Sequence, residues 1–140
     1  MKKDDDVDIL ARTIYGEARG EKLVGQEAIA SVVLNRLNFS LKNGKYWWGN
    51  SISEICLKPW QFSCWNKNDV NYNVITNIAD SDEGFKLAKR IALRAVSGML
   101  KDKTRGSTHY HTKNIRPQWS IGKIPAAEIG SHFFYNDIER

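Results

Sequence analysis

The sequence predicts an α+β fold that is mainly helical, with a small antiparallel β-sheet near its C-terminal end. Apolar residues recur at helical spacing in three segments within the first hundred residues. The last forty residues instead contain short runs of β-branched and aromatic residues, separated by turn-forming residues. Helices that precede strands in this way are typical of α+β proteins rather than of alternating α/β proteins.

The first predicted helix places a glutamate at the margin of its apolar face. Its apolar stripe consists of Val7, Leu10, Ala11, Ile14, Tyr15 and Ala18. At about 100° per residue, Glu17 lies roughly 90° from the centre of this stripe, and Gly20 is a plausible helix stop. Partial burial and the negative end of the helix dipole both favour the protonated carboxyl that a general acid requires. The alternative is an ordinary exposed glutamate at a helix end.

Two further helices follow the first. Residues 25–37 form a helix that is apolar nearly all round at 28–34, which favours a buried central position. Its polar row could anchor the helix through hydrogen bonds or line a cleft, and we favour the anchoring role. That row consists of Glu27, Ser31 and Asn35. The last helix follows a capping-box match, Asp80-x-x-Glu83. Its apolar stripe consists of Phe85, Ala88, Ile91, Ala92, Ala95, Val96 and Met99.

The segment 38–50 reads as a polar loop that carries three aromatic residues, Tyr46, Trp47 and Trp48. Such residues cap the edge of a core or offer an apolar platform to sugar rings. The match Ser51-x-x-Glu54 then predicts the start of a short helix.

Residues 60–65 alternate in polarity and predict a strand, part of a hairpin, with Gln61 and Ser63 on one face. Residues 66–82 are polar and predict a long surface loop. Cys56 and Cys64 lie on either side of the turn at Pro59. They could form a disulfide after export, and we favour two thiols as synthesised.

The C-terminal part contains three β-prone runs, S-T-H-Y-H-T, R-P-Q-W-S and H-F-F-Y. Side chains alternate between the two faces of a strand. His109 and His111 therefore share one face of the predicted sheet, and Tyr110 points to the other.

Length and charge limit the classes of function. A chain of 140 residues forms one domain, residues 1–140, with a core over about 7–135. A net charge of +5 favours a polyanionic partner, but the basic residues are scattered and no nucleic-acid-binding motif is present. No apolar run is long enough to span a bilayer. We expect no nucleic-acid partner, no membrane span and a monomeric state.

The N-terminus, M-K-K-D-D-D, has no apolar segment of the kind that secretory signal peptides carry. A protein that acts in the cell envelope, in the periplasm or cell wall, would therefore be exported by another route, phage-assisted export included, or the start of the chain is missing from this sequence.

Two other chemistries are possible on paper. His109, His111 and His132 could bind a metal ion with Glu17 or Glu21, but the H-x-H motif is short and an aromatic-rich sheet explains it equally well. Cys64 could act as a nucleophile beside a histidine, which requires a lowered thiol pKa and a partner within hydrogen-bond reach. We expect neither a metal site nor a cofactor.

Cleavage of a glycosidic bond fits the residues better. It requires a protonated acid, an aromatic groove and polar donors that hold the sugar. Glu17 supplies the acid, and Gln61, Ser63 and Tyr110 supply polar groups. The nearest second carboxylate, Glu21, lies one turn further along, where support is more natural than nucleophilic attack. A mechanism in which one glutamate acts first as acid and then as base removes the need for a second carboxylate.

Five blocks of the sequence resemble the SleB/CwlJ-type cell-wall hydrolase family, the spore cortex-lytic enzymes and their bacterial and phage relatives. The blocks are Y-G-E-A-R-G-E at 15–21, G-Q-E-A-I-A-S-V-V-L-N-R at 25–36, P-W-Q-F-S-C-W at 59–65, and S-T-H-Y-H-T and G-S-H-F-F-Y near the end. The resemblance covers roughly residues 7–135. It implies a lysozyme-like α+β fold that is related to the lytic transglycosylases.

The resemblance also implies a substrate and site residues. The substrate is peptidoglycan, cleaved between N-acetylmuramic acid and N-acetylglucosamine with a 1,6-anhydromuramoyl product, and the catalytic glutamate is Glu17. The expected substrate-binding residues are Gln61, Phe62, Ser63, Tyr110 and Trp119. Glu21 is the expected supporting neighbour of Glu17. The sequence lacks the peptidoglycan-binding repeats of many spore enzymes, which favours a stand-alone phage-type lysin or a housekeeping hydrolase. The alternatives are a non-catalytic peptidoglycan-binding module and a metal-dependent cell-wall amidase.

Overall fold

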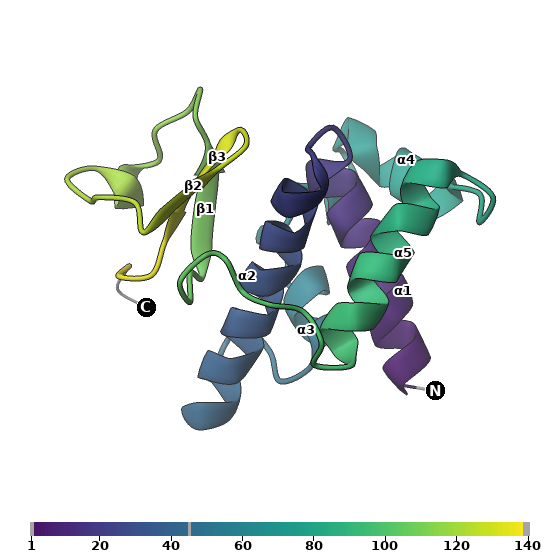
Figure 1. Ribbon diagram of the computed structural model, residues 1–140, viewed down its shortest axis with the longest axis horizontal. Helices are drawn as coiled ribbons and strands as arrows, with labels where there is room; N and C mark the ends of the chain where they lie inside the picture. The colour runs from purple at the N-terminus through teal and green to yellow at the C-terminus, as the bar shows by residue number, and fades with distance from the viewer. Residues whose placement is uncertain (1, 45, 139–140) are drawn as a thin grey trace.

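The computed structural model describes residues 2–44 and 46–138, and it confirms the predicted α+β class. The helices are α1 (Lys2–Ala18), α2 (Leu23–Lys42), α3 (Ile52–Leu57), α4 (Val70–Asn77) and α5 (Glu83–Val96), with short 3-10 helices η1 (Ser63–Trp65) and η2 (Gln118–Ser120). The strands are β1 (His109–Thr112), β2 (Ala127–Ile129) and β3 (His132–Tyr135). The helices gather on one side of the molecule and the sheet on the other, with α2 between the sheet and helices α1 and α5 (Figure 1).

The strands form an antiparallel sheet in the order β1-β3-β2, so that β1 and β2 are edge strands. Thr112 pairs with His132 in the register of β1 and β3. The inner face, which includes Phe134, packs against an apolar group on α2 that includes Ile29 and Val32. The predicted alternation is confirmed, because Tyr110 stacks on Phe134 of the inner face.

The main core lies among the helices. The predicted stripe of α1 is confirmed, because Leu10, Ala11 and Ile14 are fully buried. They join a cluster to which α5 contributes Phe85, Ala88, Ile91, Ala92 and Ala95. Burial of each large apolar side chain contributes about 1.5–3 kcal/mol, which keeps the C-terminal turn of α1 rigidly placed.

Helix α2 is longer than predicted, because residues 38–42 continue the helix instead of starting a loop. Phe39 packs edge-on against Tyr46 and Trp48, with ring centroids 4.7 and 5.5 Å apart, and Ser40 is fully buried. These tertiary contacts stabilise a last turn whose own residues give little helical signal.

The polar row of α2 anchors the helix, as we favoured. The Glu27 carboxylate accepts a hydrogen bond from Arg94 of α5 at 2.5 Å. The Asn35 amide donates to the carbonyl of Ser107 at 2.9 Å. The row therefore ties α2 to α5 and to the segment that leads into β1.

The predicted strand at residues 60–65 is wrong. The segment forms turns followed by η1, and Trp60 has a backbone φ of 70°. Phe62 and Cys64 are buried while Ser63 is exposed, so burial alternates although no strand partner is present among the described residues. Alternating polar and apolar residues indicate that every second side chain is buried. In this segment a turn buries them, so the pattern does not require a strand.

The predicted loop at 66–82 is also wrong in its middle, where helix α4 forms. Asp69 caps this helix by accepting a hydrogen bond from the Asn71 amide at 2.8 Å, and Ile75 is fully buried against the core. The helix is rich in Asn and β-branched residues, which have low helix propensity, so packing and the cap stabilise it.

The helix caps agree with prediction at one site and not at another. Ser51 accepts a hydrogen bond from the Glu54 amide at 3.1 Å, which confirms the cap of α3. Helix α5 is capped by Asp82, not by Asp80, whose carboxylate pairs with Lys89 at 2.9 Å. The run R-P-Q-W-S forms η2 instead of a strand.

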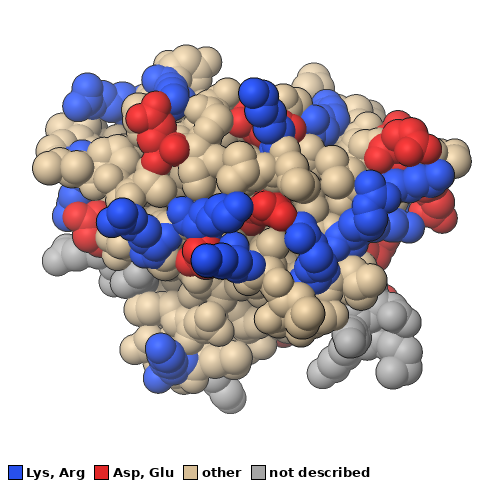
Figure 2. Space-filling view, in the orientation of Figure 1, with Lys and Arg blue, Asp and Glu red and all other residues tan. Residues whose placement is uncertain are grey.

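The surface mixes the two signs of charge. Figure 2 shows basic and acidic side chains interspersed on the face it presents. Within residues 2–44 and 46–138, none of the helices is both long enough and apolar enough to cross a bilayer.

Candidate active site

The carboxylate of Glu17 is held by two hydrogen-bond donors. Glu17 lies in the last turn of α1 and is half-buried, as its place at the edge of the apolar stripe predicts. Its Oε1 accepts a hydrogen bond from the Tyr110 hydroxyl at 2.6 Å. Its Oε2 accepts one from the backbone amide of Cys64 at 3.3 Å. The two donors come from β1 and from η1, so three separate elements meet at this carboxylate.

Tyr110 is a fixed donor in this arrangement. Burial, and then the charge of Glu17, raise the pKa of Tyr110 well above its ordinary value of 10.0. The hydroxyl therefore stays protonated at neutral pH and donates to Glu17. The Tyr110 ring stacks on Phe134 and lies edge-on to His132, which sets its direction.

Gly16 permits the close approach of α1 and η1. A Cβ at this position would lie 2.6 Å from the Cβ of Cys64 and 2.8 Å from its Sγ. Only glycine lets the helix come this near without displacing its neighbour. This contact brings the Cys64 amide within reach of Glu17.

The cysteines lack the features of a nucleophile. Cys56 and Cys64 are free, buried thiols. Burial, and then the negative charge of Glu17, raise the pKa of Cys64, and burial raises that of Cys56 to about 12. Both therefore stay protonated at neutral pH, whereas nucleophilic attack requires the thiolate.

Glu17 borders a cavity of about 390 Å³. The cavity is lined by the end of α1 and the turn that follows it, together with Asn71, Thr112 and His132. His132 is only 4% exposed, and its Nδ1 has no hydrogen-bond partner in the part of the chain that the structure describes. Burial lowers the pKa of His132, which keeps the imidazole neutral at neutral pH. From the sequence, His132 is considered only as a candidate metal ligand. The alternation of residues along a strand does not show which cavity a side chain borders.

Glu21 fastens the turn between β2 and β3 to the end of α1. Its Oε1 accepts a hydrogen bond from the Ser131 amide at 3.0 Å. Gly130 beside it has a φ of 57°, and a Cβ there would lie 2.1 Å from the same oxygen. Glu21 therefore holds this turn, and its expected support of Glu17 stays a prediction.

A buried arginine, Arg36, connects several parts of the site, and the sequence analysis missed it. Its Nε donates to the carbonyl of Thr108 at 2.8 Å, and its Nη1 donates to Oε1 of Gln61 at 3.3 Å. The guanidinium lies 5.0 and 5.2 Å from the ring centroids of Trp48 and Phe62. Burial lowers the pKa of Arg36 to about 10, so the side chain stays charged at neutral pH. The sequence contains one indication of this role, because Arg36 is a single charged residue just after the apolar run of α2.

The remaining predicted site residues occupy different environments. Phe62 is 1% exposed, so its ring supports Tyr110 and Arg36 from within the core. Ser63 is exposed at the start of η1, next to the amide that contacts Glu17. Trp119 is not brought to Glu17, because it packs against His111 and Tyr135 on the opposite face of the sheet.

The three histidines do not converge. His109 and His111 contact Trp119 on the outer face, whereas His132 lies against Tyr110 on the inner face. Across residues 2–44 and 46–138, no three His, Cys, Asp or Glu side chains are grouped as a metal site requires. The described residues therefore give no support to the alternative of a metal-dependent amidase.

A family model described as Cell Wall Hydrolase matches residues 20–135. The chain belongs to the cell wall hydrolase family. Glu17 lies just before the matched segment. Among curated proteins, the chain is 31% identical to the spore cortex-lytic enzyme of Halalkalibacterium halodurans over 137 residues, and 31% identical to that of Bacillus subtilis over 134 residues. These alignments cover 95% and 93% of this chain but 35% and 37% of the relatives, so the chain spans little more than a third of their length.

Solved structures of this cell wall hydrolase family share the fold. The catalytic domain of the Bacillus cereus SleB protein superposes with a TM-score of 0.71 at 25% identity, over 95% of this chain and 91% of that one. The catalytic domain of the germination-specific lytic transglycosylase SleB from Bacillus anthracis gives 0.71 at 26% identity, over 94% of both chains. The resemblance and the fold inferred from the sequence motifs are confirmed, and the chain is a SleB-type cell wall hydrolase homologue.

Proposed function

We propose that this protein cleaves the glycan strands of peptidoglycan between N-acetylmuramic acid and N-acetylglucosamine, as a lytic transglycosylase. The observation that carries the proposal is the half-buried Glu17 carboxylate, held by Tyr110 and the Cys64 amide at the border of a cavity. Membership of the family, and the description of the Bacillus anthracis structure as a lytic transglycosylase, support the same chemistry.

The first step is protonation of the leaving group. Protonated Glu17 donates its proton to the oxygen of the scissile glycosidic bond, and the bond between that oxygen and C1 of the muramic acid breaks. The positive charge that develops on the sugar ring lies beside the resulting carboxylate. The two donors that hold Glu17 stabilise this anionic form through charge-assisted hydrogen bonds.

The second step uses the same residue as a base. The Glu17 carboxylate removes the proton of the muramic acid C6 hydroxyl, and that oxygen forms a bond to C1, which yields the 1,6-anhydro sugar. The only other carboxylate that lines the cavity within the described residues is Glu21. Glu21 accepts the hydrogen bond of the Ser131 amide and so holds the β2–β3 turn, and the proposed reaction uses Glu17 alone.

The cavity offers polar groups to the sugars. His132 Nδ1, buried and without a partner among the described residues, is positioned to hydrogen-bond a sugar substituent such as a hydroxyl or an acetamido group. Asn71 and Thr112 line the same cavity. The net charge of +5 favours retention on an anionic cell wall, where we place the site of action.

Glu17→Gln tests the assignment. Glutamine is nearly isosteric but donates no acidic proton, so lysis of purified sacculi should fall at least ~10²-fold while the thermal unfolding curve stays close to that of the parent. Glu83→Gln, which changes an exposed carboxylate with 88% side-chain exposure, is the matched control and should lyse at the parent rate. Lysis by the Glu17 variant at the parent rate would remove Glu17 from the mechanism.

The products identify the bond that is cleaved. Mass spectrometry of fragments released from sacculi should show 1,6-anhydromuramoyl ends. Reducing ends would indicate hydrolysis by water instead, and free peptides would indicate an amidase. Sacculi that bind the protein but release no fragment would support the non-catalytic binding module.

A further inference from the structure

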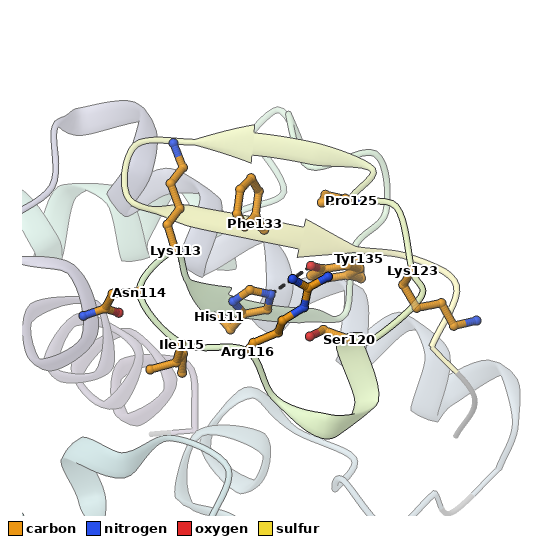
Figure 3. A pocket seen from close by; sticks show the side chains of 10 residues that line it. All are labelled: His111, Lys113, Asn114, Ile115, Arg116, Ser120, Lys123, Pro125, Phe133 and Tyr135. Carbon is orange, nitrogen blue, oxygen red and sulfur yellow. Dashed lines mark hydrogen bonds between the residues drawn. The ribbon is translucent and has the colours of Figure 1, made fainter.

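A second cavity, of about 370 Å³, lies on the outer face of the sheet, on the side away from the helices (Figure 3). Strands β1 and β3 form one wall, and the connection between β1 and β2, which includes η2, forms the other. Its volume falls within the range of about 300–1,000 Å³ that is typical of small-molecule sites. None of the catalytic chemistry assigned to Glu17 uses this cavity.

The lining of this cavity is cationic. Lys113, Arg116 and Lys123 contribute to it, and no carboxylate side chain does. Lys113 pairs with Glu128, and Lys123 lies 3.9 Å from Asp137. Arg116 has no ion pair or hydrogen bond with any residue that the structure describes.

Arg116 is directed at the pocket floor. Figure 3 shows its side chain extending toward Tyr135, whose hydroxyl pKa it lowers against the larger raising effect of burial. An arginine fork that is free in this direction is suited to bind a carboxylate or phosphate through two parallel hydrogen bonds.

The floor of the cavity is polar and rigid. His111 is 7% exposed and Tyr135 is 4% exposed, and His111 Nε2 lies 2.8 Å from the Tyr135 hydroxyl. His111 Nδ1 lies 2.7 Å from the carbonyl oxygen of Thr112. Because a carbonyl only accepts, Nδ1 carries a proton, and Nε2 shares a hydrogen bond with the Tyr135 hydroxyl. Both rings are therefore held in place before any ligand arrives.

The rest of the lining is apolar, from Ile115, Pro125 and Phe133. A bare phosphate makes no use of such a surface. A carboxylate that is attached to a short aliphatic chain uses both parts, because its charge meets Arg116 while its carbons cover the apolar wall.

The cavity lies across the sheet from the one that Glu17 borders. Thr112 and His132, which pair in the sheet, line the Glu17 cavity, whereas Lys113 and Phe133, their next neighbours, line the outer cavity. Strand β1 is an edge strand, so a chain can pass around its end from one face to the other. An extended peptide of four residues reaches about 14 Å.

We propose that the outer cavity binds a carboxylate of the short peptide that peptidoglycan carries on its muramic acid residues. The inference rests on the proposed function, since the same substrate would place its sugar beside Glu17 and its peptide around the end of β1. Arg116 is the principal contact, because Lys113 and Lys123 already lie beside the carboxylates of Glu128 and Asp137.

A binding titration tests the proposal without any turnover. The probe is a synthetic tetrapeptide that has the sequence of the peptide attached to muramic acid and keeps its carboxylates free. Its binding is measured by calorimetry and by changes in the NMR signals of the Tyr135 ring. The parent protein should bind it at the outer cavity, and Arg116→Gln should weaken binding by ~10–100-fold, the effect of losing hydrogen bonds to a charged group. Arg90→Gln, the same change at an exposed position on α5, should bind like the parent.

Several outcomes would overturn the proposal. Equal binding of the fully amidated peptide excludes carboxylate recognition, and equal weakening by Arg90→Gln shows general charge attraction. If the NMR signals of the Tyr135 ring do not change at a saturating concentration of the peptide, the peptide binds outside this cavity. Inorganic phosphate that binds more tightly than the peptide at Tyr135 would assign the cavity to a phosphate polymer instead. Because Arg116 is exposed, its variant should unfold like the parent, and Arg116→Lys should restore part of the affinity.

A second measurement separates this inference from the assignment of Glu17. Glu17→Gln should bind the tetrapeptide with the parent affinity, whatever its effect on lysis. In the active protein, Arg116→Gln should raise KM ~10-fold or more for strands that carry peptides, with kcat unchanged and no effect on strands stripped of peptides. A raised KM on the stripped strands would contradict peptide recognition.

Discussion

The carboxylate of Glu17 has two donors that come from unrelated parts of the chain. One is the Tyr110 hydroxyl and the other is the Cys64 amide. A helix-end glutamate without such partners would sample several rotamers, whereas two donors restrict it to one. In the mechanism that we propose, this restriction positions the carboxyl group to act as acid and then as base.

Tyr110→Phe tests the contribution of the hydroxyl. The ring and its packing on Phe134 remain, but Glu17 loses one hydrogen bond, so kcat should fall ~10-fold or more. Tyr46→Phe is the control, because the Tyr46 hydroxyl is buried without a partner among the described residues, and its removal should leave kcat unchanged. Rate measurements on soluble glycan strands distinguish the two. An unchanged kcat in the Tyr110 variant would show that the amide of Cys64 alone positions Glu17.

Trp60 has an unusual backbone. Its φ of 70° lies in the left-handed region, which costs a residue other than glycine about 1–2 kcal/mol, and its side chain is 78% exposed. Trp60→Gly should therefore be more stable than Trp60→Ala by about 1 kcal/mol, because both lose the ring and only glycine relieves the backbone. Urea unfolding measures the difference. Equal stability of the two variants would mean that the turn relaxes when the ring is removed.

At the scale of elements, the contact between α1 and η1 holds the Glu17 carboxylate in position. Helix α1 presents Glu17, and η1 presents the amide that it binds. Gly16 lets the two approach, while Thr13, one turn earlier, accepts a hydrogen bond from the Trp65 indole at 2.9 Å. The helix and the turn are thus joined at two points, both in the turn of α1 that precedes Glu17.

Gly16→Ala should disturb this contact. The added methyl group would lie 2.6 Å from the Cys64 Cβ, so η1 must move, at a cost of about 1–3 kcal/mol and with loss of the hydrogen bond to Glu17. Gly20→Ala is the matched control, since a Cβ there meets nothing within 4 Å. Thermal unfolding should show lower stability in the first variant and parent stability in the second, and lysis should fall in the first. A Gly16 variant with parent stability and activity would contradict the tight contact.

At the scale of the whole molecule, the sheet separates two kinds of site. Tyr110 and His132 face the helices and the Glu17 cavity, whereas His111 and Tyr135 face the outer cavity. The alternation of side chains along a strand makes this division unavoidable. Neighbouring residues of β1, His111 and Thr112, therefore line two different cavities on opposite faces of the sheet.

The buried His132 makes stability depend on pH. Burial lowers its pKa below the ordinary value of 6.5, so the unfolded chain takes up a proton at a higher pH than the folded protein does. The free energy of unfolding should therefore decline as the pH falls from about 6.5 toward 5. In His132→Gln this decline should be smaller. Urea unfolding at pH 7 and pH 5 checks it, and an equal decline in parent and variant would assign the effect to other groups.

The sequence by itself determined the helix-then-strand order, the apolar stripe of α1 and the position of Glu17. It also determined the stripe of α5 except for Met99, which lies beyond the end of the helix and is 75% exposed. These features depend on local periodicity, which a sequence states directly. It also placed Tyr110 opposite His109 and His111, because strand alternation is local. It misassigned residues 38–42, 60–65 and 66–82, where local propensity and tertiary packing disagree.

Only the tertiary structure decided which side chains meet. Glu17 and Tyr110 are 93 residues apart, and nothing in their spacing predicts a hydrogen bond of 2.6 Å. The role of Arg36 was hidden for the same reason, because its partners come from three distant segments. The sequence also gave no sign that Trp119 lies on the far face of the sheet from Glu17. Local pattern determines which face of its element a side chain occupies, and only packing between elements determines what that face meets.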